Sequence, residues 1–237
     1  MESVIKAVLI CSCVIGTVIA VAVIWNALVG NVKCEMRTYT ASNENGALDI
    51  KIEAGTLRTE YYDGNKIQVE YPVAKCYTAE IYERDGVFHF KNDFRAFFFL
   101  FVKPKVPDIV LRLPYGSRYD LRLNLSAGAV NLADGKFQNA DVNMSAGSFK
   151  CSGICCHSLK LNVSAGSANM QNLTCTGTKI KVSAGSAKLG FTGRREEYSI
   201  SKSVSAGSCD ASAQNGTTDK TIDVNVSAGA VKLNFAV

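Results

Sequence analysis

The sequence predicts an all-β fold, a parallel β-solenoid (β-helix) of about seven coils preceded by one N-terminal transmembrane helix. Three observations indicate this fold: a Ser-Ala-Gly triplet repeated six times, strand-like alternation around each triplet, and one long uncharged apolar run near the start of the 237-residue chain. A short fixed period with strand-like flanks is typical of a solenoid in which each repeat is one coil. The repeat serines are Ser126, Ser145, Ser164, Ser183, Ser205 and Ser227, spaced by 19, 19, 19, 22 and 22 residues.

The first expected element is a transmembrane helix at residues 7–30, a run without any charged side chain. A span of this length crosses a bilayer as a helix. Residues 1–6 then form a short cytoplasmic N-terminus, and the bulk of the protein lies outside the cell. The alternative is a signal peptide cleaved after Ala20-Val21-Ala22, but the apolar run continues to Leu28, past a usual hydrophobic region, which favours an anchor in the cell membrane.

Residues 31–46 are expected to be a linker, and residues 47–119 an N-terminal β region of the solenoid. This region contains Leu48–Gly55, a degenerate first copy of the repeat that ends in Ala-Gly. Turn signals such as Asp85-Gly86 separate its candidate strands. The candidate strands are 66–71, 78–83, 87–91 and 108–113.

The segment 94–102 reads FRAFFFLFV and is too short to cross a membrane as a helix. We favour a strand buried on both faces, or a cap over the open end of the first coil. The alternative is an exposed aromatic patch that docks a partner or the membrane surface.

Residues 120–237 form the Ser-Ala-Gly repeat array, whose repeats align in columns. Aliphatic residues stand one and three positions before nearly every serine, with a polar column led by asparagine between them. This alternation predicts a half-buried strand. After the triplet, the apolar residues fall four and six positions past the serine, and such a change of phase requires a bend at the glycine. The alanine is expected on the inside of this corner. The predicted corner glycines are Gly55, Gly128, Gly147, Gly166, Gly185, Gly207 and Gly229.

The triplets are interpreted as structural corners and not as nucleophile turns. The chain has only two histidines, His89 and His157, neither of which falls in a repeat column, and it lacks a Gly-x-Ser-x-Gly elbow. No calcium-loop, phosphate-loop or paired Cys-x-x-Cys pattern is present. The sequence therefore predicts no catalytic residue, no metal site and no cofactor.

Two of the nine cysteines, Cys156 and Cys175, each follow a repeat serine by eleven residues and should therefore stack on adjacent coils. Coils about 4.8 Å apart fall within the Cα separation that a disulfide accepts. The alternative is a pair of reduced thiols filling a turn, and the neighbouring Cys155 could compete as a partner.

The balance of 26 basic and 21 acidic residues gives a net charge of +5, without a basic run or an aromatic-interleaved patch. This pattern argues against nucleic acid as a partner. Lysines on the solenoid faces could weakly attract anionic envelope polymers.

The repeat blocks resemble those of a known family. The blocks LNLSAGAVNL, VNMSAGSFK, LNVSAGSANM, IKVSAGSAKL and VNVSAGAVKL, with the lead-in VPDIVLRLPYGSRYDLRLNLSAG, are similar to the bacterial "putative adhesin" family of β-strand-repeat proteins, a domain of unknown function. The resemblance covers residues 45–237. It implies a parallel β-solenoid, often on a single membrane anchor, with some relatives encoded near envelope-stress systems. It brings no catalytic residues to carry over.

The predicted function is that of a non-enzymatic, membrane-anchored extracytoplasmic scaffold, adhesin-like or associated with envelope stress. Its expected partners are the membrane, through the N-terminal helix, and an envelope polysaccharide or another envelope protein. The alternative is a polysaccharide-acting β-helix enzyme, which would require carboxylates clustered on adjacent coils. The column four residues before the serine separates its two acids by several coils, and reads Arg122, Asp141, Lys160, Lys179, Ser201 and Asp223.

Overall fold

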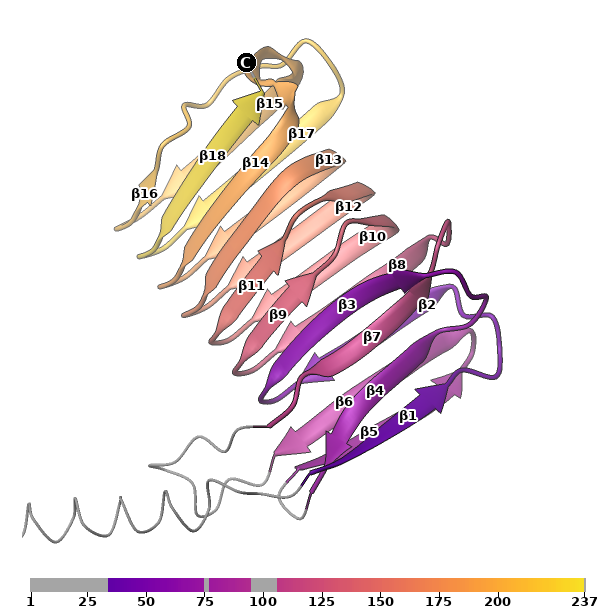
Figure 1. Ribbon diagram of the computed structural model, residues 1–237. Coiled ribbons are helices and arrows are strands. Elements are labelled where there is room, and N and C mark those ends of the chain that lie inside the picture. The colour runs from indigo at the N-terminus through magenta and orange to yellow at the C-terminus, as the bar shows by residue number, and fades with distance from the viewer. Residues whose placement is uncertain (1–33, 75–76, 95–105, 237) are drawn as a thin grey trace, which may run out of the picture.

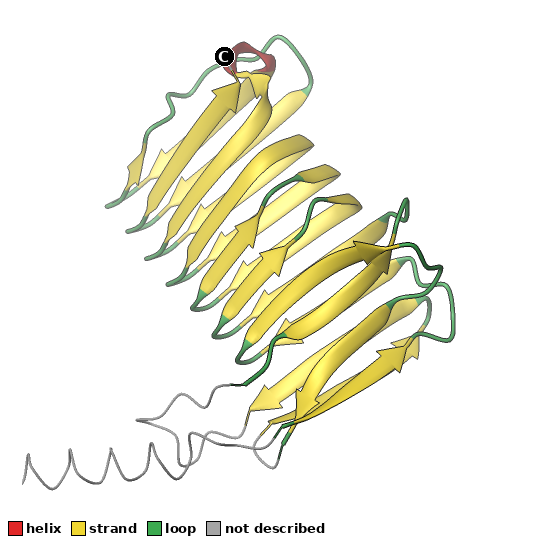
Figure 2. Cartoon of the chain, in the orientation of Figure 1, coloured by secondary structure: helices red, strands yellow, loops and turns green. Residues whose placement is uncertain are grey.

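The computed structural model describes residues 34–74, 77–94 and 106–236. The expected transmembrane helix at 7–30 and most of the apolar segment 94–102 lie outside these residues. Within the described ranges, no helix has both the length and the apolar character needed to cross a membrane. The described part is all-β apart from one short 3-10 helix, η1 (Arg195–Glu197), near the C-terminal end (Figure 2).

The described strands number eighteen and run in chain order. They are β1 (Glu35–Thr40), β2 (Ala47–Ile52), β3 (Thr56–Tyr62), β4 (Gln68–Val73), β5 (Tyr77–Arg84), β6 (Val87–Phe94), β7 (Ile109–Pro114), β8 (Tyr119–Leu125), β9 (Ala129–Leu132), β10 (Gly135–Met144), β11 (Ser148–Cys151), β12 (Ile154–Val163), β13 (Ser167–Val182), β14 (Ser186–Arg194), β15 (Tyr198–Val204), β16 (Ser208–Cys209), β17 (Lys220–Val226) and β18 (Ala230–Ala236).

The strands stack into two faces of a flattened solenoid (Figure 1). The first face runs β5, β6, β2, β8, β10, β12, the second half of β13, β17 and β15. The second face runs β1, β4, β7, β3, β9, β11, the first half of β13, β14, β18 and β16. All pairings in these two faces are parallel except those of β5, β4 and β1, which close one end of the stack antiparallel.

The spatial order of the coils differs from the chain order at both ends of the stack. The coil of β2 and β3, which contains the degenerate first repeat, lies between that of β8 and β9 and that of β6 and β7. At the other end, the coil of β17 and β18 lies between that of β13 and β14 and that of β15 and β16. The last two described strands, β17 and β18, therefore form an internal coil, and β15 is the outermost described strand of the first face.

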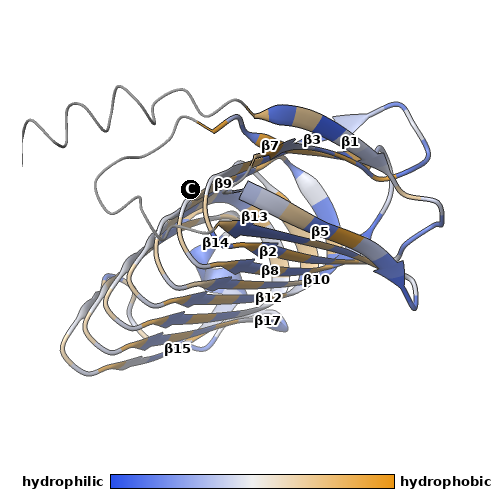
Figure 3. Ribbon diagram, turned by 90° about the horizontal axis from the view of Figure 1, so that it is seen from below, coloured by the Kyte–Doolittle hydropathy of each residue, from blue (hydrophilic) through white to orange (hydrophobic). Residues whose placement is uncertain are grey.

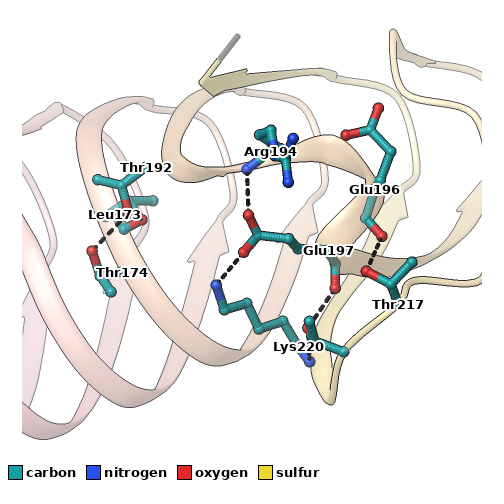
Figure 4. Close-up of polar contacts among 9 residues, drawn as sticks. Leu173, Thr174, Thr192, Arg194, Glu196, Glu197, Thr217 and Lys220 are labelled. Carbon is teal, nitrogen blue, oxygen red and sulfur yellow. Dashed lines mark hydrogen bonds and ion pairs between the residues drawn. The ribbon is translucent and has the colours of Figure 1, made fainter.

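Polar contacts hold this inserted C-terminal coil against η1 (Figure 4). The ammonium of Lys220 donates to the carboxylate of Glu197 at 2.6 Å, and the backbone N–H of Thr217 donates to the carbonyl of Glu196 at 2.8 Å. The hydrogen bond from Lys220 lowers the pKa of Glu197 and raises that of Lys220. These contacts fix where β17 begins.

The predicted columns are present in the fold. Equivalent residues of successive repeats pair across the coils, as Leu123 does with Val142, and the aliphatic columns form one buried core. Hydrophobic and hydrophilic residues alternate along the strands, as the view from below shows (Figure 3). The exceptions lie in β15, where Lys202 occupies an aliphatic column and Val204 is 37% exposed, because no coil covers this strand.

The four strands expected between residues 66 and 113 are confirmed as β4 to β7, with bounds shifted by at most three residues. Two strands were not predicted. Residues 35–40, expected to be linker, form β1, and residues 56–62 form β3. The triplet alanines were expected inside the corners, but all six are exposed. The inside of each corner is instead occupied by the glycine backbone.

Candidate functional site

The corners are built from glycines that stack directly on one another. A Cβ atom at Gly128 would lie 2.1 Å from the carbonyl oxygen of Gly55, and one at Gly166 would lie 2.7 Å from that of Gly147. Equivalent close approaches of 2.1 to 2.3 Å occur at Gly147, Gly185, Gly207 and Gly229. Backbone hydrogen bonds such as Ala146 N–H to Ser126 O continue the strand ladder through the corner. The corner therefore has no space for any side chain.

Backbone conformation distinguishes two classes of corner. Gly55, Gly128 and Gly147 have φ values of +104°, +123° and +106°, in the region that favours glycine. The other four predicted corner glycines lie outside this region, so close approach alone excludes a side chain there. The repeat serines belong to these corners, and no histidine stands in register with them.

The most distinctive polar surface is a single column along the first face, which we call the first-face column. It contains one side chain from each strand of that face. In spatial order it reads Tyr82, His89, Asp49, Arg122, Asp141, Lys160, Lys179, Asp223 and Ser201. The expectation that neither histidine falls in a repeat column is wrong for His89, because the non-sequential coil order places β6 beside β2.

One end of this column is a groove of about 420 Å³ in which donors and acceptors alternate. The ring of Tyr82 stacks on that of His89, with centroids 4.5 Å apart and an interplanar angle of 14°. His89 Nδ1 lies 3.2 Å from Asp49 Oδ2, while Asp49 Oδ1 is buried and has no hydrogen-bond partner among the described residues. His89 and Asp49 line the groove together with Arg122, Asp141 and Lys160, whereas Tyr82 lies beside it in the column.

Beyond His89 and Asp49, the column contains the cationic side chains of Arg122 and Lys160. Arg122 lies between Asp49 and Asp141, yet neither Arg122 nor Lys160 forms an ion pair with any described residue. The carboxylate of Asp141 instead accepts a hydrogen bond from Asn143 at 3.0 Å. Such side chains can bind hydroxyl, amide or carboxylate groups of a ligand. No group of three or more potential metal ligands occurs within the described ranges.

The second face carries a simpler column of asparagine and basic residues. Its members are Arg58, Asn131, Lys150, Asn169, Lys188 and Lys232. Arg58 pairs with Glu60 at 3.4 Å, whereas no ion pair involves the three lysines within the described part of the chain. The two faces therefore differ in charge: the column of the first face contains both acids and bases, and bases dominate that of the second.

The carboxylates are arranged differently from the expectation. Asp141 and Asp223 are three coils apart, but the degenerate repeat brings Asp49 within two coils of Asp141, and Asp120 lines the same groove. The sequence already indicated that Asp49 belongs to this column, since Asp49 stands four residues before Glu53, which replaces the repeat serine. Its neighbours could not be inferred without the coil order.

The predicted cysteine register is present. Cys156 pairs with Cys175 on adjacent coils, both side chains are buried, and their Sγ atoms lie 3.0 Å apart. The contact with Cys175, reinforced by burial, raises the pKa of Cys156 well above its ordinary value. Both cysteines are free thiols in this structure, and Cys155 is exposed.

Comparison with known proteins finds one matching family and several solved structures of similar fold. The family model described as "Toastrack DUF4097" matches residues 44–236. A search of curated proteins finds no match. A structure described as a "putative cell adhesion protein" from Clostridium sporogenes is similar at 12% identity and a TM-score of 0.46, over 86% of this chain and all of that chain. A "putative adhesin" from Bacteroides fragilis is similar at 12% identity and a TM-score of 0.42, over 86% of this chain and 98% of that chain.

Proposed function

Because the chain belongs to the Toastrack DUF4097 family, we propose that it is a non-enzymatic, adhesin-like binding scaffold of the cell envelope. The observation that carries this proposal is the first-face column, an unbroken row of polar and charged side chains on a rigid surface. The proposed ligand is an extended polar polymer, and an envelope polysaccharide is the first candidate.

The geometry of the column suits a polymer better than a small molecule. Stacked strands present one side chain about every 4.8 Å, a spacing comparable with one sugar unit of an extended glycan. Each contact is weak by itself, but contacts repeated along one chain add through effective concentration. Arg122 and Lys160 form no ion pair with another described residue, so they supply donors without first breaking one. The stacked ring of Tyr82 provides an apolar platform at one end.

The proposal includes the cellular location of the repeat domain. An uncharged run at residues 7–30 supports a single membrane anchor with the repeat domain outside the cell. This position would bring the first-face column to envelope polymers or to another envelope protein, and an association with envelope stress would fit the same place. Nucleic acid is not a proposed partner.

Co-sedimentation tests the proposal directly. The full chain in detergent is mixed with insoluble polysaccharides such as peptidoglycan, chitin and cellulose. We expect binding to at least one of them, and the double variant R122A/K160A should lose about tenfold or more in affinity, since charge-assisted contacts contribute about 1.5–3 kcal/mol each. The matched control K150A/K188A removes the same charge from the second face and should change affinity less than about threefold. Equal losses for both variants would indicate nonspecific charge attraction and contradict the proposal.

A second candidate function follows from one observation: Asp49, Asp120 and Asp141 line the same groove. A glycan-cleaving enzyme uses two carboxyl groups on either side of the scissile bond. Release of new reducing ends from soluble glycans, abolished in D49N or D141N, would favour the enzyme over the scaffold.

A further inference from the structure

A second groove lies on the edge of the solenoid opposite the glycine corners, which we call the turn edge. Here the second-face strands turn back into the first-face strands of the next coil. The groove encloses about 450 Å³, within the range of small-molecule sites. Residues from four successive turns and from the end of β3 line it, among them Tyr61, Tyr115, Ser117, Asp134, Lys136 and Thr174. The first-face column contributes none of its side chains to this groove.

Tyr115 is the most exposed large aromatic side chain of the described residues, at 67%. The residue is nevertheless held in place. Its backbone N–H donates to the carbonyl of Tyr62 at 3.1 Å, and its ring stacks on that of Tyr61 with centroids 6.0 Å apart and an interplanar angle of 27°. A rigid aromatic ring with its face in water loses little conformational entropy when a ligand covers it.

Tyr61, whose ring stacks against that of Tyr115, has a hydroxyl that forms no hydrogen bond with another described residue. Its Oη atom is buried and finds no hydrogen-bond partner among the described residues. Burial, assisted by the nearby Tyr119, Cys151 and Asp134, raises the pKa of Tyr61 to about 12, so the group remains a protonated donor near neutral pH. A buried donor without an acceptor destabilises the free protein, and a ligand that supplies an acceptor removes this cost.

The space around this hydroxyl is a local departure from the repeat. Gly135 pairs with Ile154, which pairs with Leu173, so the equivalent position on the next two coils is a buried aliphatic residue. A Cβ atom at Gly135 would lie 2.4 Å from Tyr61 Oη. Glycine at this position therefore leaves room for the hydroxyl, where the repeat pattern would otherwise place a side chain.

The polar groups around the two rings favour a neutral ligand. The carboxylate of Asp134 accepts hydrogen bonds, whereas Lys136 and Ser117 donate them, and the opposite charges of Asp134 and Lys136 disfavour both a strong anion and a strong cation. A sugar ring has an apolar C–H face and hydroxyls that both donate and accept. From this arrangement we propose that the turn-edge groove binds a neutral sugar unit, stacked on Tyr115 and hydrogen-bonded by Asp134 and Tyr61.

This site is independent of the first-face column and of its proposed function. The test is saturation-transfer NMR on the full chain in detergent, with glucose, galactose, N-acetylglucosamine and their disaccharides as probes. We expect saturation of at least one probe. Y115A should weaken binding at least tenfold, and Y115F, which keeps the ring, should restore it. The matched control is Y82A, which removes the exposed tyrosine of the first face and should leave this binding unchanged.

Tyr61→Phe separates a binding role from a structural one. Because the substitution removes an unpartnered buried hydroxyl, the melting temperature should stay equal or rise while sugar affinity falls. The proposal is overturned if no probe is saturated by the wild type, or if Y115A binds as well as the wild type. It is also overturned if Y82A abolishes binding, because the sugar would then occupy the first-face column.

Discussion

The Sγ atoms of Cys156 and Cys175 lie 3.0 Å apart on adjacent coils, both thiols buried. A mild oxidant such as oxidised glutathione should join them, with the two thiols losing two protons and two electrons to the oxidant. The bridge would close a loop of one repeat and should stabilise the fold by about 3 kcal/mol. Non-reducing peptide mapping after oxidation should yield a linked peptide, and the melting temperature should rise.

The variant C155S is the control, since Cys155 is exposed and should take no part in the bridge. If Cys156 and Cys175 are both alkylated without reductant after oxidation, the pair functions as reduced core thiols. If Cys155 replaces one of them in the linked peptide, the coil register does not control the pairing.

Glu83 anchors the closed end of the stack. Its carboxylate accepts hydrogen bonds from the hydroxyl of Tyr39 (3.0 Å), the backbone N–H groups of Ser42 (2.7 Å) and Asn43 (2.9 Å), and the amide of Asn45 (2.9 Å). Burial alone would raise the pKa of Glu83, but these four bonds outweigh it and lower the pKa to about 2. We expect Glu83→Gln to cost about 1–2 kcal/mol at neutral pH, a value reduced for partial exposure to solvent.

The stabilisation by Glu83 depends on pH. A carboxyl group whose pKa is lower in the folded state stabilises the fold above its ordinary pKa of 4.5, and this stabilisation is lost as the pH falls towards 2. Urea unfolding at several pH values should therefore show the Glu83→Gln penalty shrinking from pH 5 downward. The exposed Glu80 of the same strand provides the control, Glu80→Gln. A penalty that does not change with pH would show that the carboxylate charge is not what stabilises this end.

The corner glycines should differ in their tolerance of alanine. Gly128 combines a φ of +123° with an approach of 2.1 Å to Gly55 O, whereas Gly166 has only the approach of 2.7 Å to Gly147 O. We expect Gly128→Ala to cost about 1–3 kcal/mol and Gly166→Ala to cost less. The adjacent exposed Ala165 supplies the control, since Ala165→Ser should change stability by at most about 0.5 kcal/mol. Equal losses in thermal unfolding for all three variants would refute the assignment of the corners.

Lys202 protects the open end of the stack. It occupies a column that is aliphatic in the other array coils, on the outermost strand, beside Val204 with 37% exposure. Only part of this strand edge is covered, through the paired backbone of Ile200 and Gln214. Charged residues at inward positions of an edge strand prevent strand addition. Lys202→Val should therefore promote concentration-dependent end-to-end association.

Analytical ultracentrifugation of the full chain in detergent measures this association. The variant Lys181→Val removes a charge from a strand that is paired on both edges, and it should sediment like the wild type. Unchanged sedimentation of Lys202→Val up to high concentration would show that the lysine does not guard the edge.

The proposed anchor can be tested in cells. If residues 7–30 span the membrane with the repeat domain outside, protease added to intact cells should remove the domain and leave the anchor in the membrane fraction. A cytoplasmic protein serves as the control for lysis. Digestion that occurs only after lysis would reverse the proposed orientation.

The repeat pattern predicts the two-faced stack because each column has one constant character, as in the aliphatic pair Leu123 and Val142. The same uniformity conceals the order of the coils. Lys179 pairs with Asp223 and not with Ser201, and near-identical repeats carry no signal that selects between these neighbours. Strand β1 was missed because its residues are mostly exposed and lack an apolar face. The turn-edge groove was missed because it arises where Tyr61 lies against Gly135, and only the coil order brings β3 beside this part of the array.

The inserted coils also bear on biogenesis. During synthesis, β15 emerges from the ribosome before β17, at a time when the edge of β13 is still open and suits either strand. If β15 paired with β13 in the nascent chain, this pairing would have to break before β17 could insert between the two strands. The contacts of Glu196 and Glu197 with Thr217 and Lys220 exist only in the observed order, so they stabilise this arrangement once Thr217 and Lys220 have been synthesised. Strands β17 and β18 therefore complete this part of the stack, and the observed order of coils forms only after both strands have been synthesised.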